Sequence, residues 1–165
     1  MGGWRDQPLT PTHLTPDEQT THISLWCLWG SPMIIGMPIE RLDAFTLSLL
    51  SNDEVLDVNQ DPLGIQGRRA KAAGGEAVVK PLEDGSRAVG LLNPGSEPAQ
   101  VTIAWSTLGL QGPQQVHDLW RRKASFCPSF NLLAERHDST GGGQTACHQD
   151  PPDPPLGCNV RPTWA

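Results

Sequence analysis

The stretch Glu54–Gly64 divides this chain into two halves with different sequence patterns. Before it, helical patterns alternate with short apolar runs, and after it short alternating segments are separated by turn residues. Val55, Leu56 and Val58 form an aliphatic run of strand length. Turn-forming residues then end the run, namely Asn59, Asp61, Pro62 and Gly64. We therefore predict a strand at 55–58, followed by a passage of the chain from one structural layer into another.

The first half begins with a strong helix signal. Thr15 is a preferred N-cap, Pro16 suits the first helical position, and Glu18 can reach back to complete a capping box. The following residues, from Ile23 to Trp29, are apolar on nearly all sides. Such a helix is expected to be buried on more than one side.

The apolar run Met33–Gly36 predicts a short strand that is covered on both faces. Asp43 can cap a second helix, with Asn52 and Asp53 closing it before the predicted strand at 55–58. A strand, helix, strand unit makes its two strands parallel, and two parallel strands with two helices do not form a stable domain. We therefore expect this half to need further strands as partners.

The second half predicts antiparallel strands. The segments 76–82 and 87–93 are joined by Asp84-Gly85, which is a strong hairpin turn. A third strand is predicted at 100–105, with Val101, Ile103 and Trp105 on one face. A fourth is predicted at 114–120, where the pattern leaves the inward face open. Three or four such strands suggest part of a β-sandwich.

From Ala124 the composition changes abruptly, with many prolines and a run of three glycines. No helical or strand period continues there, and we expect residues 124–165 to be disordered. Cys127, Cys147 and Cys158, with His148 beside Cys147, could be imagined as a zinc site. They lack the short paired spacing of structural zinc sites, so we predict no metal.

The formal net charge of −6 argues against binding to nucleic acid or to an anionic membrane surface. Basic residues cluster only at 68–71 and 121–123, and each cluster is short. No apolar run approaches the ~18 residues of a membrane-spanning helix, and the N-terminus lacks the residue order of a signal peptide. The sequence leaves the cellular compartment open.

Four ordered motifs resemble the α-galactosidases of glycoside hydrolase family 27. The first combines Leu14–Gln19 with Thr21–Trp26, and the second is Val58-Asn59-Gln60-Asp61-Pro62-Leu63-Gly64. The third is Val79–Val89, and the fourth is Asp118–Arg121. The similarity covers roughly residues 9 to 123. It implies the last strands and helices of a (β/α)8 TIM barrel at 1–66, part of a C-terminal antiparallel β-sandwich at 67–123, and an aberrant tail at 124–165. A frameshift near Lys123 is our hypothesis for that tail.

The resemblance also implies what the chain lacks. Family members use two aspartates in a retaining mechanism, and both lie on barrel strands upstream of the matching region. We therefore assign no catalytic, cofactor-binding or metal-binding residue in this chain and expect no cofactor. Met37 and Pro38 stand where the family often has Cys or Asn and then Asp, which argues against a polar substrate contact from that loop.

Two local carboxylates follow the barrel-like segment. Asp61 lies at the end of the predicted strand, where barrel enzymes keep their active sites. Its side chain has two possible roles, as a site residue or as an acceptor of backbone hydrogen bonds in a turn. The turn role is favoured. Asp57, within the predicted strand, is expected to be a buried hydrogen-bond acceptor.

The histidines and tryptophans show no catalytic constellation. His13, His22 and His117 lack metal spacing, and His22 is expected to pack in a core or interface. Trp26 and Trp29 could line a sugar site, although core packing is favoured for both. Trp105 and Trp120 are expected to pack in the core of the sandwich.

The resemblance implies a hydrolase of terminal α-linked galactose, with an α-galactoside as the partner of the full-length protein. We expect the isolated chain to be inactive, poorly soluble and broad in its unfolding. Two alternatives remain open: a non-catalytic carbohydrate-binding or interaction module at 67–123, and a vestigial truncated protein. The oligomeric state is also left open.

Overall fold

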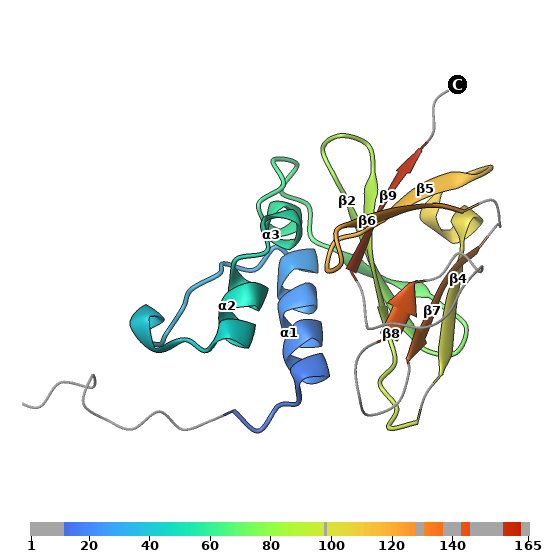
Figure 1. Ribbon diagram of the computed structural model, residues 1–165. Coiled ribbons are helices and arrows are strands. Elements are labelled where there is room, and N and C mark those ends of the chain that lie inside the picture. Colours follow the sequence, from blue (N-terminus) through green and yellow to red (C-terminus); the bar gives the residue numbers. More distant parts are fainter. Residues whose placement is uncertain (1–11, 98, 128–130, 137–142, 146–156, 163–165) are drawn as a thin grey trace, which may run out of the picture.

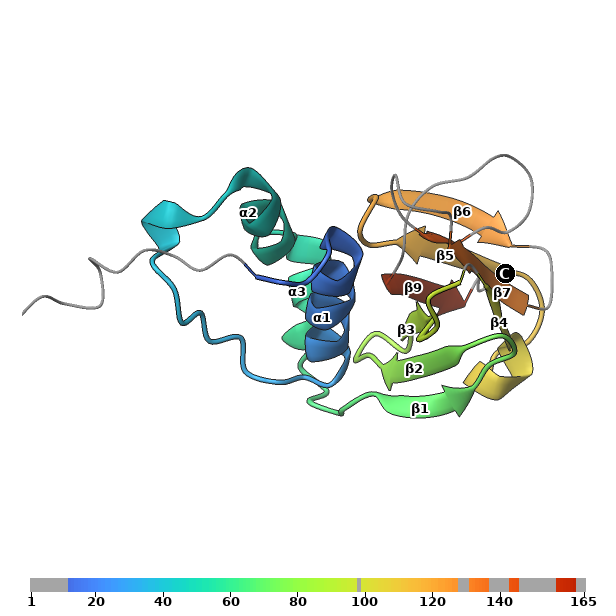
Figure 2. The same ribbon diagram turned by 90° about the horizontal axis from the view of Figure 1, so that it is seen from below.

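A computed structural model describes residues 12–97, 99–127, 131–136, 143–145 and 157–162. A group of helices from the first half lies beside a β-sandwich from the second half (Figure 1). Within the helical group, α1 (Pro16–Leu28) and α3 (Asp53–Asn59) lie next to the sandwich, and α2 (Ala44–Leu50) lies on their far side (Figures 1 and 2). The order of elements, helices followed by antiparallel strands, agrees with the predicted change at Glu54–Gly64.

The helical group contains α1 (Pro16–Leu28), a short 3-10 helix η2 (Ile39–Arg41), α2 (Ala44–Leu50) and α3 (Asp53–Asn59). The predicted capping box is confirmed: Glu18 N donates to Thr15 Oγ1 at 3.3 Å, and Thr15 N donates to Glu18 Oε2 at 2.7 Å. Asp43 caps α2 as predicted, accepting from Thr46 N at 2.8 Å.

The predicted strand at 55–58 is wrong, because these residues form α3. Asn52 does not close the preceding helix but caps α3, with its side chain accepting from Val55 N at 3.4 Å. Asp53 and Glu54 then occupy the first turn, where negative charge is favoured by the helix dipole. Val55 and Val58, three residues apart, point to the same buried side. The cap and this spacing override the β-propensity of valine.

The predicted strand at Met33–Gly36 is also absent from the described structure. These residues form no β-ladder with any other described residue, so the parallel strand pair is not found. A strand requires a neighbouring backbone to accept and donate its hydrogen bonds. The described structure therefore leaves the barrel assignment of residues 1–66 unconfirmed.

The sandwich consists of a six-stranded sheet, ordered β1-β2-β3-β9-β5-β6, and a three-stranded sheet, ordered β4-β7-β8. Every strand pairing in it is antiparallel. The strands are β1 (Arg68–Lys71), β2 (Glu76–Pro81), β3 (Arg87–Leu92), β4 (Gln100–Ala104), β5 (Gln114–Asp118), β6 (Lys123–Cys127), β7 (Asn131–Arg136), β8 (Gly143–Thr145) and β9 (Gly157–Pro162). A 3-10 helix, η3 (Trp105–Leu108), follows β4.

The four strands predicted for the second half are confirmed, with small changes at their ends. The hairpin between β2 and β3 turns through Asp84-Gly85, and Gly85 has the positive φ of 83° that the turn requires. Strand β5 faces inward with Gln114, Val116 and Asp118, which settles the face that the sequence left open.

The expectation of a tail without regular structure after Ala124 is wrong for the described residues. Strand β6 pairs with β5, and β9 inserts between β3 and β5 in the larger sheet. Strand β7 pairs with β4 and joins β8 in the smaller sheet. The pairings of β9 with β3 and of β7 with β4 join strands separated by long stretches of chain, so no local pattern revealed them. The expectation of disorder for 137–142 and 146–156 lies outside the described residues.

Strands β2 and β3 are buried on both faces. On one face Ala77 and Val89 join the core of the sandwich, which also holds Ile103, Trp105 and Val116. On the other face, side chains from the same two strands join a second core with the helices. Its members are Ile23, Cys27, Leu28, Leu49, Val55, Val58, Val78, Leu82, Ala88 and Leu119. One sheet therefore supports two cores, and this second core is the seam between the two halves.

Among the described residues, no helix has the length and apolar character needed to cross a membrane.

Candidate functional site

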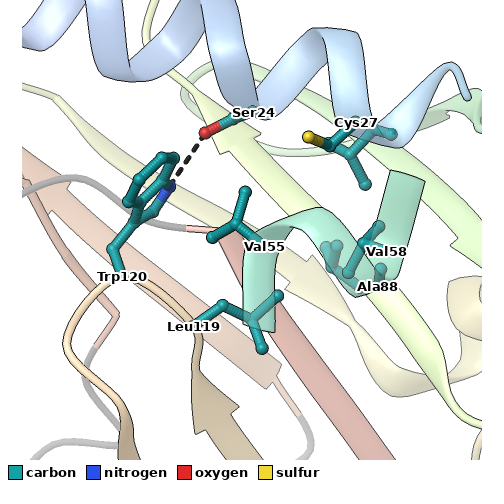
Figure 3. Close-up of a pocket in the computed structure, with 9 residues that line it drawn as sticks. Ser24, Cys27, Val55, Val58, Ala88, Leu119 and Trp120 are labelled. Carbon is teal, nitrogen blue, oxygen red and sulfur yellow. Dashed lines mark hydrogen bonds between the residues drawn. The ribbon is translucent and has the colours of Figure 1, made fainter. Parts of the chain in front are cut away.

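The seam contains a small cavity with almost entirely apolar walls (Figure 3). Helices α1 and α3, strand β3 and the turn after β5 line it. The lining residues are Ser24, Cys27, Leu28, Val55, Val58, Ala88, Val89, Leu119 and Trp120. Its volume of about 10 Å³ is close to the space that one water molecule occupies. A sugar ring does not fit in this cavity.

Hydrogen bonds from the turn between β5 and β6 connect the sandwich to the helices. Trp120 Nε1 donates to Ser24 Oγ at 2.9 Å, and Ser24 Oγ in turn donates to the carbonyl oxygen of Thr20 at 2.8 Å. Asn52 Nδ2 donates to the carbonyl oxygen of Leu119 at 3.0 Å. The N-cap of α3 and the turn after β5 therefore hold each other in place.

Two pairs of ionisable side chains lie at the edge of the contact between α3 and the turn after β5. His117 Nε2 lies 2.7 Å from Glu54 Oε2, and both side chains are about a third exposed. Arg122 pairs with Asp53, at a largely exposed position. Pairs this open to water contribute little stability.

Lys80 is the most unusual polar residue of the seam, because its side chain is only 1% exposed. Its ammonium group donates to the carbonyl oxygen of Val58 and lies 3.5 Å from that of Asn59. These carbonyls end α3, where no helical N–H is available to them and the helix dipole favours a positive charge. Lys80 therefore acts as a C-terminal cap donated by the neighbouring sheet.

The buried environment of Lys80 also affects the pKa of its ammonium group. Burial lowers the pKa of the Lys80 ammonium, while the negative charge of Asp61, and that of Cys27 when its thiol ionises, oppose that change. For Cys27, which is 1% exposed, burial raises the thiol pKa to about 11, and the nearby charge of Lys80 opposes the rise. A thiol with so high a pKa is protonated at neutral pH and is a poor nucleophile.

Asp118 shapes the turn that carries Trp120. Its carboxylate accepts from Trp120 N at 3.0 Å and from Arg121 N at 3.1 Å. Burial raises the pKa of Asp118, opposed by these backbone hydrogen bonds and by the charge of Arg121. Arg122 ends the turn with a positive φ of 55°. These contacts give Asp118 a structural role.

Asp61 has the turn role that the sequence favoured. Its carboxylate accepts from Leu63 N at 3.1 Å and from Glu83 N at 3.0 Å, which ties the segment after α3 to the β2–β3 hairpin. The prediction for Asp57 is wrong, since this residue is exposed on α3 and not buried in a strand.

The aromatic candidates separate into two groups. Trp105 is 1% exposed in the sandwich core, as predicted, and Trp120 lies half-buried in the seam. His22 is not in a core: it is exposed and stacks on Trp26, with ring centroids 5.1 Å apart and planes 7° apart. Trp29 is 38% exposed, so the core role favoured for it is also wrong.

The other predicted positions bring no chemistry together. Met37 is exposed and Pro38 is buried, while His13 is exposed and distant from the seam in sequence. Among the residues that the structure describes, no group of three or more potential metal ligands is found. Cys147 and His148 lie outside the described residues, as do the side chains of Cys127 and Cys158.

Sequence analysis missed Lys80 and Ser24. Lys80 shares one face of β2 with Val78 but also with Glu76, so the alternation in the sequence did not mark a charge pointing into a core. Ser24 stood alone in an apolar helix, but nothing in the sequence indicated Trp120 as its partner, 96 residues later.

Comparison with known proteins defines the class of protein to which the chain belongs. Residues 73–140 match the family described as the α-galactosidase C-terminal β-sandwich domain. Arabidopsis thaliana α-galactosidase 3 is 36% identical over 149 residues, which cover 83% of this chain and 34% of the relative. The Coffea arabica α-galactosidase is 39% identical over 131 residues, covering 76% of this chain and 35% of the relative.

A solved structure extends the likeness to most of this chain. The family 27 β-L-arabinopyranosidase of Geobacillus stearothermophilus superposes with a TM-score of 0.75 at 25% identity, covering 92% of this chain and 31% of that chain. These similarities define a C-terminal region of a glycoside hydrolase. The chain belongs to the α-galactosidases of glycoside hydrolase family 27.

Two limits of the match bear on the predictions above. The chain spans about a third of the length of the curated relatives it matches. We expected the resemblance to end near Lys123, but the match to the β-sandwich family continues to residue 140. A change of reading frame at Lys123 is therefore not supported.

Proposed function

We propose that this chain forms the C-terminal part of a retaining glycoside hydrolase that removes terminal α-linked galactose, and that the chain by itself is inactive. The single observation that carries the proposal is the match to α-galactosidases across both the helices and the sandwich, with 36% identity over 149 residues to the Arabidopsis relative. A carbohydrate is therefore the expected substrate of the whole protein.

The described site supports inactivity of the isolated chain. A retaining glycosidase needs two carboxyl groups about 5 to 5.5 Å apart on either side of the bond that is cleaved. Asp61 is used as a backbone acceptor and Asp57 lies exposed on α3. The seam cavity is of water size. The seam cavity is therefore too small to hold a sugar between two carboxyl groups.

The division of the chain remains part of this proposal. We propose that residues 1–66 belong to a catalytic TIM barrel and residues 67–123 to the C-terminal β-sandwich. The concentration of exposed large apolar side chains between residues 14 and 65 supports an incomplete first domain. The change from helices to antiparallel strands near residue 67 supports the boundary.

The proposal is tested by joining this chain to the part of the Arabidopsis α-galactosidase 3 that precedes its match. We expect the fusion to hydrolyse p-nitrophenyl α-galactoside, and the purified chain alone to show no more hydrolysis than a preparation from cells that carry an empty vector. Hydrolysis by the chain alone would refute its inactivity. A soluble, folded fusion without hydrolysis would refute the proposed contribution to α-galactosidase activity.

The binding-module alternative is tested on the chain alone by titrating its tryptophan fluorescence with galactose, melibiose and raffinose. Trp105 lies within the sandwich core and Trp120 donates to Ser24 inside the seam. Trp105 is too buried to contact a sugar and the indole N–H of Trp120 is already bonded, so we expect no saturable change. A saturable change would favour the alternative.

A further inference from the structure

We propose that α3 opens and closes as a single unit, which is folded only while the sandwich holds both of its ends. The inference goes beyond the proposed function and uses it in one respect, because residues 53–59 lie in the segment proposed for the barrel. The sandwich therefore controls the conformation of part of the first domain, and the seam opens when α3 opens.

Helix α3 is too short, and too poor in helix-forming residues, to be stable alone. It spans seven residues. Isolated helices shorter than about 12–15 residues are marginal in water even when they are rich in alanine. Five of the seven residues are valine, aspartate or asparagine, which have low helix propensities. The stability of α3 must therefore come from contacts outside the helix.

The N-terminal end of α3 is held by the turn after β5. Asn52 is 6% exposed and caps the helix, because its Oδ1 accepts from Val55 N at 3.4 Å. Its Nδ2 donates to the carbonyl oxygen of Leu119 at 3.0 Å, across the seam. In the first turn of the helix, Glu54 Oε2 lies 2.7 Å from His117 Nε2. A single buried amide group thus serves both the helix and the sandwich.

The C-terminal end of α3 is held by strand β2 and by the hairpin that follows it. The buried ammonium group of Lys80 donates to the carbonyl oxygen of Val58 and lies 3.5 Å from that of Asn59. These carbonyls have no donor within the helix. Directly after the helix, the carboxylate of Asp61 accepts from Glu83 N at 3.0 Å. Because so short a helix has few backbone hydrogen bonds, the loss of either end is expected to unfold all of it.

The opening of α3 can be followed at Cys27. Val55 and Val58 line the seam cavity together with Cys27 of α1 (Figure 3). All three residues are buried. Unfolding of α3 withdraws both valines from the wall of the cavity, so the thiol of Cys27 then meets solvent.

The experiment measures hydrogen exchange of the folded chain, resolved to single amides by mass spectrometry with electron-transfer fragmentation. The hydrogen-bonded amides of α3 are those of residues 56–60, from Leu56 N, which donates to Asn52 O, to Gln60 N, which donates to Leu56 O. In the parent chain we expect these amides to share one protection factor, lower than that of the amides of β4 in the sandwich. Fraying from the ends predicts instead a gradient of protection along the helix.

Two substitutions each release one end of α3. Asn52→Asp keeps an oxygen that can cap the helix but replaces the donor to Leu119 with a second oxygen. Lys80→Met removes the donor to Val58 at the other end. We expect each substitution to raise the exchange rate of all the α3 amides by roughly tenfold, because a buried carbonyl oxygen loses its donor. The end remote from the substitution should respond as strongly as the near end.

Alkylation of Cys27 gives a second readout for Asn52→Asp, which leaves Lys80 in place. The rate of labelling by iodoacetamide should rise by the same factor as the exchange rate of α3. The matched controls are Asp43→Asn, at the cap of the equally long α2, and Lys71→Met, on the exposed strand β1. Neither control should change the labelling rate or the exchange rate of α3.

Three outcomes in the variants contradict a single opening of α3. The two ends open independently if faster exchange is confined to the end that carries the substitution. Unchanged exchange in both variants means that the sandwich contacts do not hold the helix. An equal acceleration in β4 means that α3 opens only with the whole chain.

The parent chain decides the question even where a variant fails to fold, since a gradient of protection along α3 overturns the proposal by itself. None of these readouts involves a galactoside. A failure of this proposal is therefore distinguishable from a failure of the proposed function, which is tested by hydrolysis.

Discussion

The indole nitrogen of Trp120 donates a 2.9 Å hydrogen bond to the hydroxyl of Ser24, which lies 96 residues earlier in the chain (Figure 3). The bond joins the turn after β5 to the middle of α1 at the wall of the small seam cavity. Because Ser24 also donates to the carbonyl of Thr20, its single hydroxyl satisfies groups in both halves of the chain. The seam therefore joins the helices and the sandwich through a specific polar contact as well as through apolar packing.

Replacing Ser24 with alanine should destabilise the seam. Ser24→Ala leaves the half-buried Trp120 N–H without its acceptor, and an unpaired buried polar group costs up to about 1–3 kcal/mol. We expect this loss in the free energy of unfolding, measured by urea titration followed through tryptophan fluorescence. Ser48→Ala on the exposed side of α2 is the control and should change stability little. Equal effects of the two substitutions would show that the Trp120 bond contributes nothing specific.

Gly67 should not tolerate a side chain. Its N–H donates to the carbonyl oxygen of Leu28 at 2.8 Å, and a Cβ added there would lie 2.8 Å from that oxygen and 2.9 Å from a methyl group of Val78. Gly67→Ala must push the end of α1 away from β2, at a cost of about 1–3 kcal/mol. The midpoint of thermal unfolding by circular dichroism tests this.

Gly36→Ala provides the comparison, because nothing lies within 4 Å of an added Cβ at that exposed position. The Gly67→Ala variant should therefore unfold at a clearly lower temperature than the Gly36→Ala variant. Identical midpoints would contradict the close approach of α1 to β2.

The buried ammonium of Lys80 should make stability depend on pH in the alkaline range. Burial lowers the pKa of Lys80 in the folded state below its ordinary value of 10.5. Between the lowered pKa and 10.5 the unfolded chain binds more protons at this group than the folded chain, so the contribution of Lys80 to stability rises with pH. Below that window both states are protonated and the contribution is constant.

The measurement compares the free energy of unfolding of the parent chain with that of Lys80→Met from neutral pH to pH 10.5. The difference, parent minus variant, should increase with pH within the window. Lys71→Met, at an exposed position of β1, should show no such trend. A difference for Lys80→Met that stays flat with pH would show that the ammonium is not desolvated in the folded state.

Cys27 should resist alkylation while the chain is folded. Its side chain is 1% exposed and burial raises its pKa to about 11, so at pH 8 the reactive thiolate is scarce as well as inaccessible. We expect iodoacetamide to label Cys27 far more slowly in buffer than in urea, as measured by mass spectrometry of the peptide that contains it. Equal labelling rates in the two conditions would indicate that the seam is open in solution.

Local sequence patterns predicted the features that depend on neighbouring residues. The capping box of Thr15 and Glu18, the cap of Asp43 and the Asp84-Gly85 hairpin all lie within a few residues and are present in the structure. The alternation in β4 likewise placed Val101 and Ile103 in the core. The resemblance to family 27 depended on ordered motifs and is confirmed by the comparisons.

The errors arose where a local pattern suited two structures. The run around Val55 has the composition of a strand, but the Asn52 cap and the i, i+3 spacing of Val55 and Val58 make it a helix. The apolar run at Met33–Gly36 has the composition of a strand but no described partner with which to form one. Strands β6 to β9 escaped prediction because their composition is poor in strand signals, and because β7 and β9 pair with strands distant in sequence.

The sequence by itself determined the family, the caps of α1 and α2, the turn between β2 and β3 and the order of a helical half before an antiparallel half. The tertiary structure decided how these halves meet: Lys80 capping α3, Trp120 donating to Ser24, and one sheet covered on both faces. The physical reason is the distance along the chain between the interacting residues. Caps and turns are set by hydrogen bonds among neighbouring residues, whereas a buried charge or an indole N–H is satisfied only by groups that folding brings from elsewhere in the chain.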